Sequence, residues 1–306
     1  MTRHPRAAWI VFGLPVIIGL AGAGLVWSWS GDLPDQIARH WGGSGAADGF
    51  SSLTASIATT LAVGPGLALL AGAVIWALKV PSRVTAAITV GLTSFVIGLD
   101  LATTGAQRGL EDASDVELST WWFLVAIGAS VIGCVAGVLL TPRDRYEGSR
   151  PDDPVPAASS ANWSGVVRSQ VFLGISGVIS LAGVALLFLP SLGFMIGVIL
   201  VLTGLPLLAT AWWRVSIDQH GVRLRTFLPW PVWRVTADRI TGAELTTIGP
   251  GDVGGWGLRM TPRGTSLAYQ RGEAVVIHRR DARPLSIVID DASGAAAAVN
   301  AQIRAD

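Results

Sequence analysis

The segment Leu33–Phe50, LPDQIARHWGGSGAADGF, brings together side chains that could do chemistry: His40 with Asp35 and Asp48. An imidazole beside a carboxylate forms a hydrogen-bonded pair, and two carboxylates with one imidazole could hold a weakly bound cation. A protein metal site needs at least three good ligands with supporting hydrogen bonds, and this segment has one histidine. We therefore expect a structural His–Asp pair, with either aspartate as the partner, and no bound metal.

Asp100 is the second residue of interest, because it lies within an apolar run about one turn from its end. A carboxylate inside a membrane is costly and often functional. Two interpretations stay open. Asp100 either reaches the headgroup water as a cap, or has a buried partner or a transport role. The neighbouring apolar runs offer no arginine, lysine or histidine for a proton relay.

The elements that position these residues are long apolar runs. Only 14% of the 306 residues are charged, against about a quarter in typical soluble proteins. Each run has about 20 residues, enough for a helix to cross a bilayer. The first run is too long for a signal peptide, so we expect it to remain as a span. We predict six spans, at residues 8–29, 54–78, 84–104, 119–141, 170–190 and 192–213.

The basic residues predict the orientation, because arginine and lysine accumulate on the cytoplasmic side. One set of connections carries Arg3, Arg6, Lys79, Arg83, Arg143, Arg145, Arg150, Arg168 and the tail from Arg214. The other set carries only Arg39 and Arg108. Both termini are therefore expected in the cytoplasm, with the His40 segment outside, in a bacterial plasma membrane. The single lysine among 22 basic residues indicates a GC-rich genome.

Tryptophans and small residues add local predictions. Tryptophans at span ends are expected to be interfacial anchors; these are Trp9, Trp27, Trp29, Trp76, Trp121, Trp122, Trp212 and Trp213. Pro65 in GPG should kink the second span. Two small-xxx-small pairs, Gly133 with Gly137 and Gly193 with Gly197, are expected to permit close helix contact.

The loop at residues 30–53 resembles the signature of the membrane-protein family with domain of unknown function 1648, which is related to the sporulation-delaying-toxin immunity proteins. The matching residues are Leu33, Pro34, Asp35, Ile37, His40, Trp41, Gly45, Asp48, Gly49 and Phe50. Ala38 departs from the pattern, which usually has a second proline there. The resemblance covers about the first 80 residues. It implies no enzymatic chemistry, and for some relatives it implies recognition of a toxic peptide outside the cell or inward signalling.

The two outer connections are acidic. They hold seven acids against Arg39 and Arg108, an excess of 7 − 2 = 5 negative charges; the acids are Asp32, Asp35, Asp48, Glu111, Asp112, Asp115 and Glu117. Such a surface would attract a cation or a basic peptide. Alternatively, the acids are simply what the positive-inside bias leaves outside.

The second half of the chain changes character. Residues 142–169 are rich in proline, serine and charge and predict a flexible cytoplasmic linker between a four-span unit, 1–141, and a two-span hairpin, 170–213. Residues 214–306 alternate polar and apolar side chains in about eight short strands, followed by a helix capped by Asp291 or Ser293. This pattern, with the turn GGWGLR, resembles the pleckstrin-homology-like domain of bacterial membrane proteins. It implies an interaction or assembly module. Its basic side chains could meet anionic headgroups or be merely solvated; they are Arg223, Arg225, Arg234 and Arg239.

The fold expected is thus an α-helical polytopic membrane protein with a C-terminal, cytoplasmic, pleckstrin-homology-like β-plus-helix domain. No catalytic motif, cofactor motif or nucleic-acid-binding run occurs in the sequence. We expect a non-enzymatic protein that combines outer recognition, immunity or sensing with an inner interaction domain. The alternative is a small transporter or an accessory subunit of a transport complex. The expected partners are the bilayer, a secreted peptide or a cation outside, and a cytoplasmic protein or a second copy inside.

Overall fold

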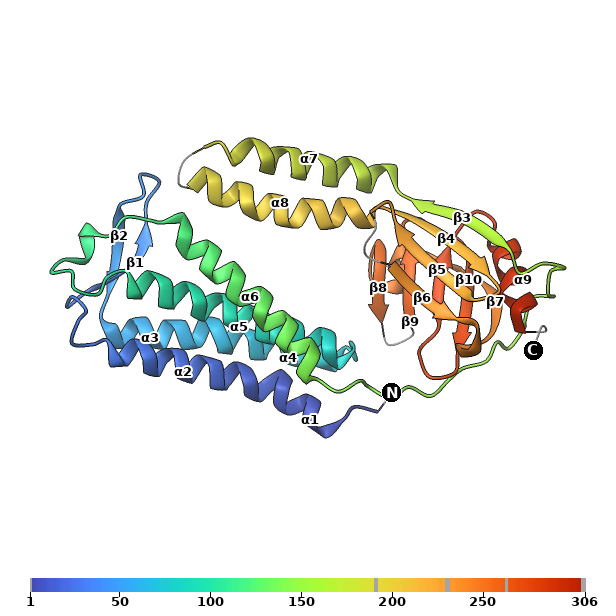
Figure 1. Cartoon of the computed structure of the whole chain (residues 1–306), viewed down its shortest axis with the longest axis horizontal. Helices are drawn as coiled ribbons and strands as arrows, with labels where there is room; N and C mark the ends of the chain where they lie inside the picture. Colours follow the sequence, from blue (N-terminus) through green and yellow to red (C-terminus); the bar gives the residue numbers. More distant parts are fainter. Residues whose placement is uncertain (1, 190–191, 229–231, 262–263, 304–306) are drawn as a thin grey trace. The chain divides into compact units, whose positions relative to one another are not determined.

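The computed structural model describes residues 2–189, 192–228, 232–261 and 264–303 (Figure 1). The chain divides into two compact units. The helical unit comprises Arg3–Asp144 with Ala185–Val198, and the β unit comprises Met1–Thr2, Arg145–Val184 and Ile199–Asp306. Long apolar helices followed by a β-rich region agree with a membrane protein that carries a β domain.

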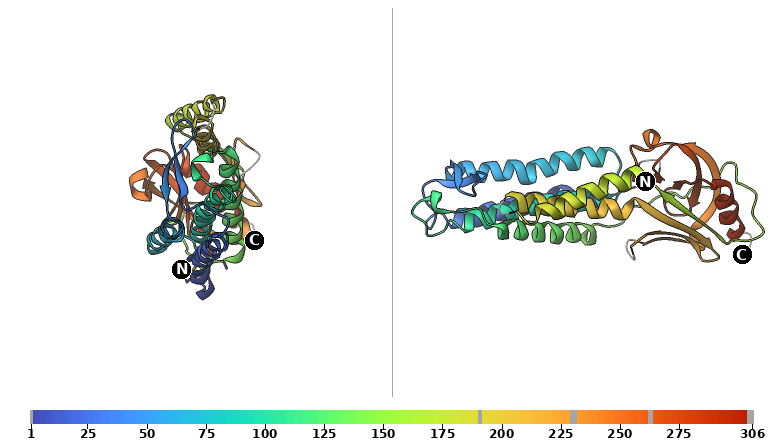
Figure 2. Two further views of the ribbon diagram at one scale, coloured as in Figure 1. Left: turned by 90° about the vertical axis from the view of Figure 1, so that its left-hand side faces the viewer. Right: turned by 90° about the horizontal axis from the view of Figure 1, so that it is seen from above.

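Four helices of the helical unit are long and apolar enough to cross a membrane. They are Pro5–Ser28, Leu53–Ala77, Ser82–Gly105 and Thr120–Leu140, and they confirm the position of the first four predicted spans. The first of these contains α1 (Pro5–Ala8) and α2 (Leu14–Ser28), and the second contains α3 (Leu53–Leu61) and α4 (Leu67–Ala77). The third is α5 (Ser82–Gly105) and the fourth is α6 (Thr120–Leu140). Helix α5 contacts α2, α4 and α6, so the helices pack side by side, and the left view of Figure 2 looks along them.

The predicted disturbance at Pro65 takes the form of a π-helical segment, Ala62–Gly66, between α3 and α4. A proline removes one backbone donor and crowds the preceding turn, and a wider turn relieves both. A second such segment, Trp9–Gly13, joins α1 to α2 just before Pro15. The helix is thus irregular at GPG, as a π-helical segment, and the predicted kink itself stays a prediction.

Glycines set the closest helix contacts. A Cβ atom added at Gly137 would lie 2.6 Å from the carbonyl oxygen of Ala86, so α6 packs directly on the backbone of α5 as predicted. For the second predicted pair, a Cβ atom at Gly193 would meet the Leu189 side chain, and Gly197 is buried. The closest described contacts between α7 (Gln170–Leu186) and α8 (Leu192–Thr210) lie at Gly183 and Gly204, so a role for the Gly193–Gly197 pair stays a prediction.

Tryptophan exposure separates anchors from core residues. Trp9, Trp27 and Trp121 are exposed on their helices, as expected of interfacial anchors. Trp122 and Trp213 are buried, so the anchor prediction is wrong for both. Trp122 packs beneath the loops at one end of the helical unit, and Trp213 lies in strand β4 (Trp212–Asp218), because α8 ends at Thr210 rather than 213.

Besides most of the last two apolar helices, the described part of the β unit contains two sheets and a further helix. The first sheet is antiparallel, in the order β3 (Trp163–Arg168), β4, β5 (Gly221–Thr226), β6 (Val232–Thr236). The second has the order β7 (Ile240–Ile248), β10 (Gly272–Arg279), β11 (Leu285–Val288), β9 (Gly264–Ala268), β8 (Gly257–Thr261). Within it, β9 and β11 are parallel. All eight predicted strands are present, and β3 is additional.

Strand β3 corrects the prediction of a flexible linker over 142–169. It pairs along its whole length with β4, from Trp163 opposite Ile217 to Arg168 opposite Trp212. The helices α7 and α8 therefore form a hairpin between two adjacent strands of one sheet. They are shorter apolar helices than the first four.

The segment before β3 is also fastened to the β unit. The His278 ring joins Ser149 Oγ at 2.9 Å and Glu244 Oε1 at 3.0 Å, and Glu244 accepts the backbone N–H of Asp152 at 2.8 Å. Burial opposes ionisation of Glu244, but the hydrogen bonds from His278 and the backbone outweigh it and hold its pKa below the ordinary value. These bonds clasp residues 149–153 to β7 and β10.

Helix α9 (Ala292–Ile303) closes the β unit by covering the shared core of the two sheets. Asp291 caps it, as one of the two predicted alternatives: its carboxylate accepts the N–H of Gly294 at 3.0 Å. Buried apolar side chains from both sheets and α9 form this core, and its largest members include Trp213, Leu224, Leu267 and Ile277.

Candidate functional site

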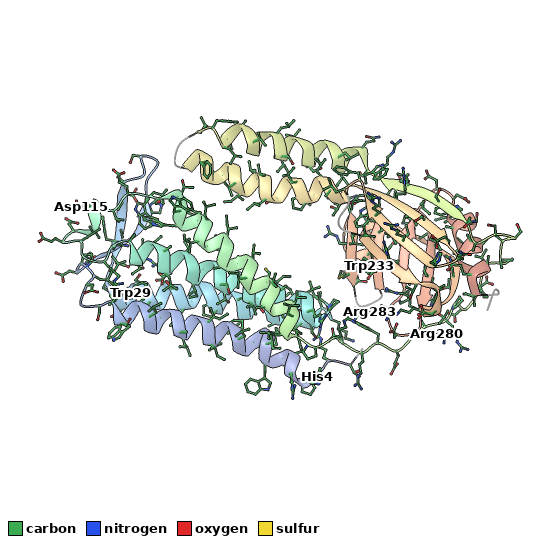
Figure 3. All side chains as sticks on the ribbon, viewed as in Figure 1. His4, Trp29, Asp115, Trp233, Arg280 and Arg283 are labelled. Atoms are coloured by element: carbon green, nitrogen blue, oxygen red, sulfur yellow. The ribbon has the colours of Figure 1, made fainter. Side chains whose placement is uncertain are left out.

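One end of the helical unit carries a folded cap, defined as residues 29–52 and 106–119. Its hairpin consists of β1 (Ile37–Trp41) and β2 (Ala47–Ser51), which join α2 to α3. In Figure 3, Trp29 and Asp115 mark this end of the unit and His4 lies at the other. The two connections are bonded together, because Leu118 N–H donates to Gly45 O at 2.8 Å and Gly109 N–H donates to Asp32 O at 2.7 Å.

A small apolar core holds the cap on the helices. The rings of Trp41 and Trp122 lie 5.2 Å apart, and Trp41 Nε1 donates to the carbonyl of Val116 at 3.1 Å. Ala38 and Ala113 are buried against them. Trp41, a residue of the predicted recognition loop, is thus a core residue of the cap.

The predicted His–Asp pair forms with Asp48. His40 Nδ1 lies 2.5 Å from Asp48 Oδ1, and the two side chains are 74% and 52% exposed. Gly49 lies opposite, where a Cβ atom would come within 2.8 Å of His40 Cβ, so only glycine fits without displacement. Gly45 supplies the turn of the hairpin with a φ of +86°.

The other predicted loop residues do not converge on His40. Leu33 and Pro34 are half-buried in the entry to β1, and Asp35 is exposed. Phe50 lies on β2 opposite Ala38 with its side chain exposed. The structure therefore brings His40, Asp48 and Gly49 together, and places Trp41 and Gly45 against the second connection. Within the described part of the chain, no three His, Cys, Asp or Glu side chains are grouped to hold a metal ion.

Asp100 is buried and has a half-buried partner that the sequence did not suggest. Arg39, on β1, forms an ion pair with Asp100, whose side chain is only 6% exposed. Thr60 on α3 donates to Asp100 Oδ1 at 3.0 Å and accepts from Arg39 at 2.8 Å. The interpretation of Asp100 as a water-facing cap is wrong, and the alternative of a buried partner is confirmed. The sequence did contain one indication of this ion pair: Arg39 is the single arginine in an otherwise acidic loop.

Gln107 is a second anchor that the sequence did not suggest. Its buried side-chain amide accepts the N–H of Ala38 at 2.7 Å and donates to the carbonyls of Ala38 at 3.2 Å and Thr103 at 3.1 Å. The Gln107 amide thus makes with Ala38 the two hydrogen bonds that a residue of an adjacent strand would make. A proline at position 38 would have no N–H to give, which accounts physically for the alanine found there.

The exposed surface of the cap is more acidic than the count of its acids and arginines implied. All seven acids are exposed, while Arg39 is taken up by Asp100 beneath the cap. Against Arg108 alone, the exposed excess is 7 − 1 = 6 negative charges. Arg108 itself pairs with Asp32 at 2.8 Å. Hydrogen bonds from the backbone and side chain of Ser114 hold the pKa of Asp112 below its ordinary value, so this carboxylate stays ionised.

No protein-family model matches this chain, and comparisons with curated proteins and with solved structures likewise give no match. The resemblances of the Leu33–Phe50 loop and of the β unit to known families therefore stay predictions.

Proposed function

We propose that the protein is a non-enzymatic bacterial membrane protein whose cap, on the outer face of the plasma membrane, recognises a basic peptide. The observation that carries the proposal is the folded acidic face of the cap, from which the charge of Arg39 is withdrawn. A rigid surface with six excess negative charges concentrates a cationic partner before contact.

The proposed topology has six spans, with α7 and α8 as the last two and both termini in the cytoplasm. It is supported by the distribution of arginines, and by the way the connections away from the cap are held together. Arg3 donates to the carbonyl of Trp76 at 2.9 Å, and Ser82 N–H donates to Asp144 at 2.7 Å, so the basic ends gather opposite the cap. The β unit then lies in the cytoplasm as an interaction module.

A single-cysteine pair tests the topology. In a Cys134→Ala background, Ser44→Cys in the cap should react with an impermeant maleimide in intact cells, and Ser159→Cys should react only after permeabilisation. Both serines are exposed. The reverse pattern would overturn the orientation.

Binding is tested with hexa-arginine and full-length protein in nanodiscs. Neutralising Glu111, Asp112, Asp115 and Glu117 to their amides should weaken binding by about tenfold or more, and added salt should weaken wild-type binding in the same way. Asp152→Asn with Asp153→Asn, exposed acids of the β unit, is the control and should leave binding unchanged. Equal binding by the cap variant and wild type would refute the proposal.

A transporter is the second candidate, favoured by one observation, the buried carboxylate of Asp100. Its Oδ1 is held by Arg39 and Thr60, which supports an anchoring role instead. An Asp100→Asn variant that inserts and unfolds like wild type but lacks function would favour transport. Loss of hexa-arginine binding in the neutralised cap favours recognition.

A further inference from the structure

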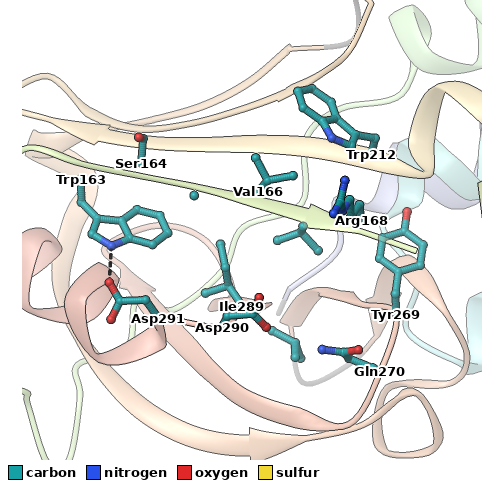
Figure 4. A pocket seen from close by; sticks show the side chains of 13 residues that line it. Trp163, Ser164, Val166, Arg168, Trp212, Tyr269, Gln270, Ile289, Asp290 and Asp291 are labelled. Atoms are coloured by element: carbon teal, nitrogen blue, oxygen red, sulfur yellow. Dashed lines mark hydrogen bonds between the residues drawn. The ribbon is translucent and has the colours of Figure 1, made fainter. Parts of the chain in front are cut away.

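A groove of about 720 Å³ adjoins strand β3 in the β unit (Figure 4). All six residues of β3 line one side of it, and residues 288–291 with Tyr269 and Gln270 line the other. Successive side chains of a strand point to opposite faces of the sheet. Because side chains from both faces line the groove, it is the edge of β3 that borders it.

The free backbone groups of this edge can be assigned. Among the described strands, β3 is the outermost of its sheet and pairs only with β4. Ser169 N–H donates to Ala211 O at 3.2 Å, and bonded and non-bonded pairs alternate along an antiparallel ladder. Counting back from Ser169, the N–H and C=O groups of Ser164, Val166 and Arg168 therefore point away from β4 and into the groove.

The groove is lined by both apolar and charged side chains. Val166 is 41% exposed, and Ile289 lines the opposite wall. At one end, Trp163 Nε1 donates to Asp291 at 2.8 Å, and the exposed Asp290 lies next to Ile289, between this end and Gln270 (Figure 4). Arg168 lies at the other end with Trp212 and Tyr269 (Figure 4). Among the residues that the structure describes, neither Arg168 nor Asp290 forms an ion pair.

These features fit an extended peptide segment, because an unpaired strand edge offers the hydrogen bonds of a further strand and the pockets beside it accept alternate side chains. A second copy of the chain fits poorly. With α7 in the membrane as proposed above, β3 leads directly into that helix in every copy. In two copies related by an axis along the membrane normal, the β3 strands that lead into the membrane would run in the same direction. Such strands cannot pair antiparallel with each other.

We propose that the β3 edge binds an extended peptide antiparallel to itself, with an acidic side chain beside Arg168 and a basic one beside Asp290. From Trp163 to Arg168, β3 advances five residues, at about 3.3 Å per residue. A long basic side chain near the Trp163 end is then within reach of Asp290. This site is independent of the cap, and the two proposals can fail separately.

The probes are two labelled hexapeptides, ETVTVK and its reverse KVTVTE, titrated by fluorescence anisotropy against the full-length protein in nanodiscs. An antiparallel peptide enters with its N-terminus at Arg168, so ETVTVK should bind about tenfold or more tightly than KVTVTE. Arg168→Glu should remove or invert this preference. Equal binding of the two peptides by wild type would overturn the charge assignment.

Val166→Pro removes an edge N–H that β4 does not use, and should reduce ETVTVK affinity by about tenfold or more. Arg234→Pro is the matched control, because β6 is the other open edge of the same sheet. It should leave binding unchanged. Should Val166→Pro not fold, Arg168→Glu carries the test alone. Absence of saturable binding by either peptide, or wild-type affinity in folded Val166→Pro, would overturn the proposal. So would dimerisation in sedimentation that Val166→Pro abolishes, since it would assign the edge to a second copy.

Discussion

Arg39 and His40 are neighbours in β1, yet their ion pairs lie in opposite surroundings. Arg39 reaches beneath the cap to Asp100, whose side chain is 6% exposed, while His40 meets Asp48 on the outer face, where both side chains are largely exposed. The alternation of a strand sends one side chain to each face. Two pairs of the same kind, a base with a carboxylate, thus have different roles. The buried pair anchors the cap to the helices, and the exposed pair stays available to a partner.

The largest effect is expected from Arg39→Met, which leaves Asp100 buried without its counter-charge. We expect a loss of about 3–5 kcal/mol in the free energy of unfolding, measured by thermal or chemical unfolding in nanodiscs.

The double variant Arg39→Met with Asp100→Leu is the control, because removing both charges relieves the penalty. It should recover most of the stability. A single variant as stable as wild type would mean that the buried pair is no anchor, and the contrast with His40 would disappear.

An intermediate effect is expected from Gln107→Leu, which orphans the N–H and C=O of Ala38 beneath the cap. A buried backbone group without a partner costs about 1–3 kcal/mol, so we expect a loss of about 2 kcal/mol in unfolding free energy. Gln36→Leu makes the same change at an exposed position and should lie within about 0.5 kcal/mol of wild type. Equal losses in both variants would contradict the role assigned to Gln107.

A smaller effect is expected at Asp291, an exposed carboxylate that differs from Asp48 by capping a helix. Hydrogen bonds from the Trp163 indole and the Gly294 N–H hold the pKa of Asp291 below its ordinary 3.8. Asp291→Ala should cost about 1 kcal/mol in the unfolding of the β unit at neutral pH. Because the folded-state pKa is depressed, this stabilisation is present above pH 3.8 and disappears as the pH falls through the lower folded value. A difference between variant and wild type that persists in strong acid would exclude this cause.

The smallest effect is expected from His40→Ala. Exposed ion pairs contribute little, and the unfolding free energy should change by less than about 0.5 kcal/mol. A substantial loss would show that the outer pair, like the inner one, is structural. It would remove the main difference between the two faces of β1.

Local patterns were sufficient to predict the first four long helices, the eight strands after α8 and the cap of α9. Apolar length, alternation and capping residues depend on near neighbours. Features that depend on distant partners were missed. Arg39 and Asp100 lie in different elements, β3 sits in a proline- and serine-rich stretch beside a hairpin, and Gln107 acts through a backbone it meets only in the fold. The His40–Asp48 pair was predictable because both residues lie in one short loop.

The insertion of α7 and α8 between β3 and β4 imposes an order on assembly. β3 is synthesised before the hairpin, and its ladder partner β4 only after it. The first sheet therefore stays incomplete until the ribosome has produced both helices and the hairpin has brought its two ends together. Closure of the hairpin therefore precedes completion of the sheet, and a chain whose hairpin has not closed would leave β3 as an unpaired strand, which is a template for pairing with other chains.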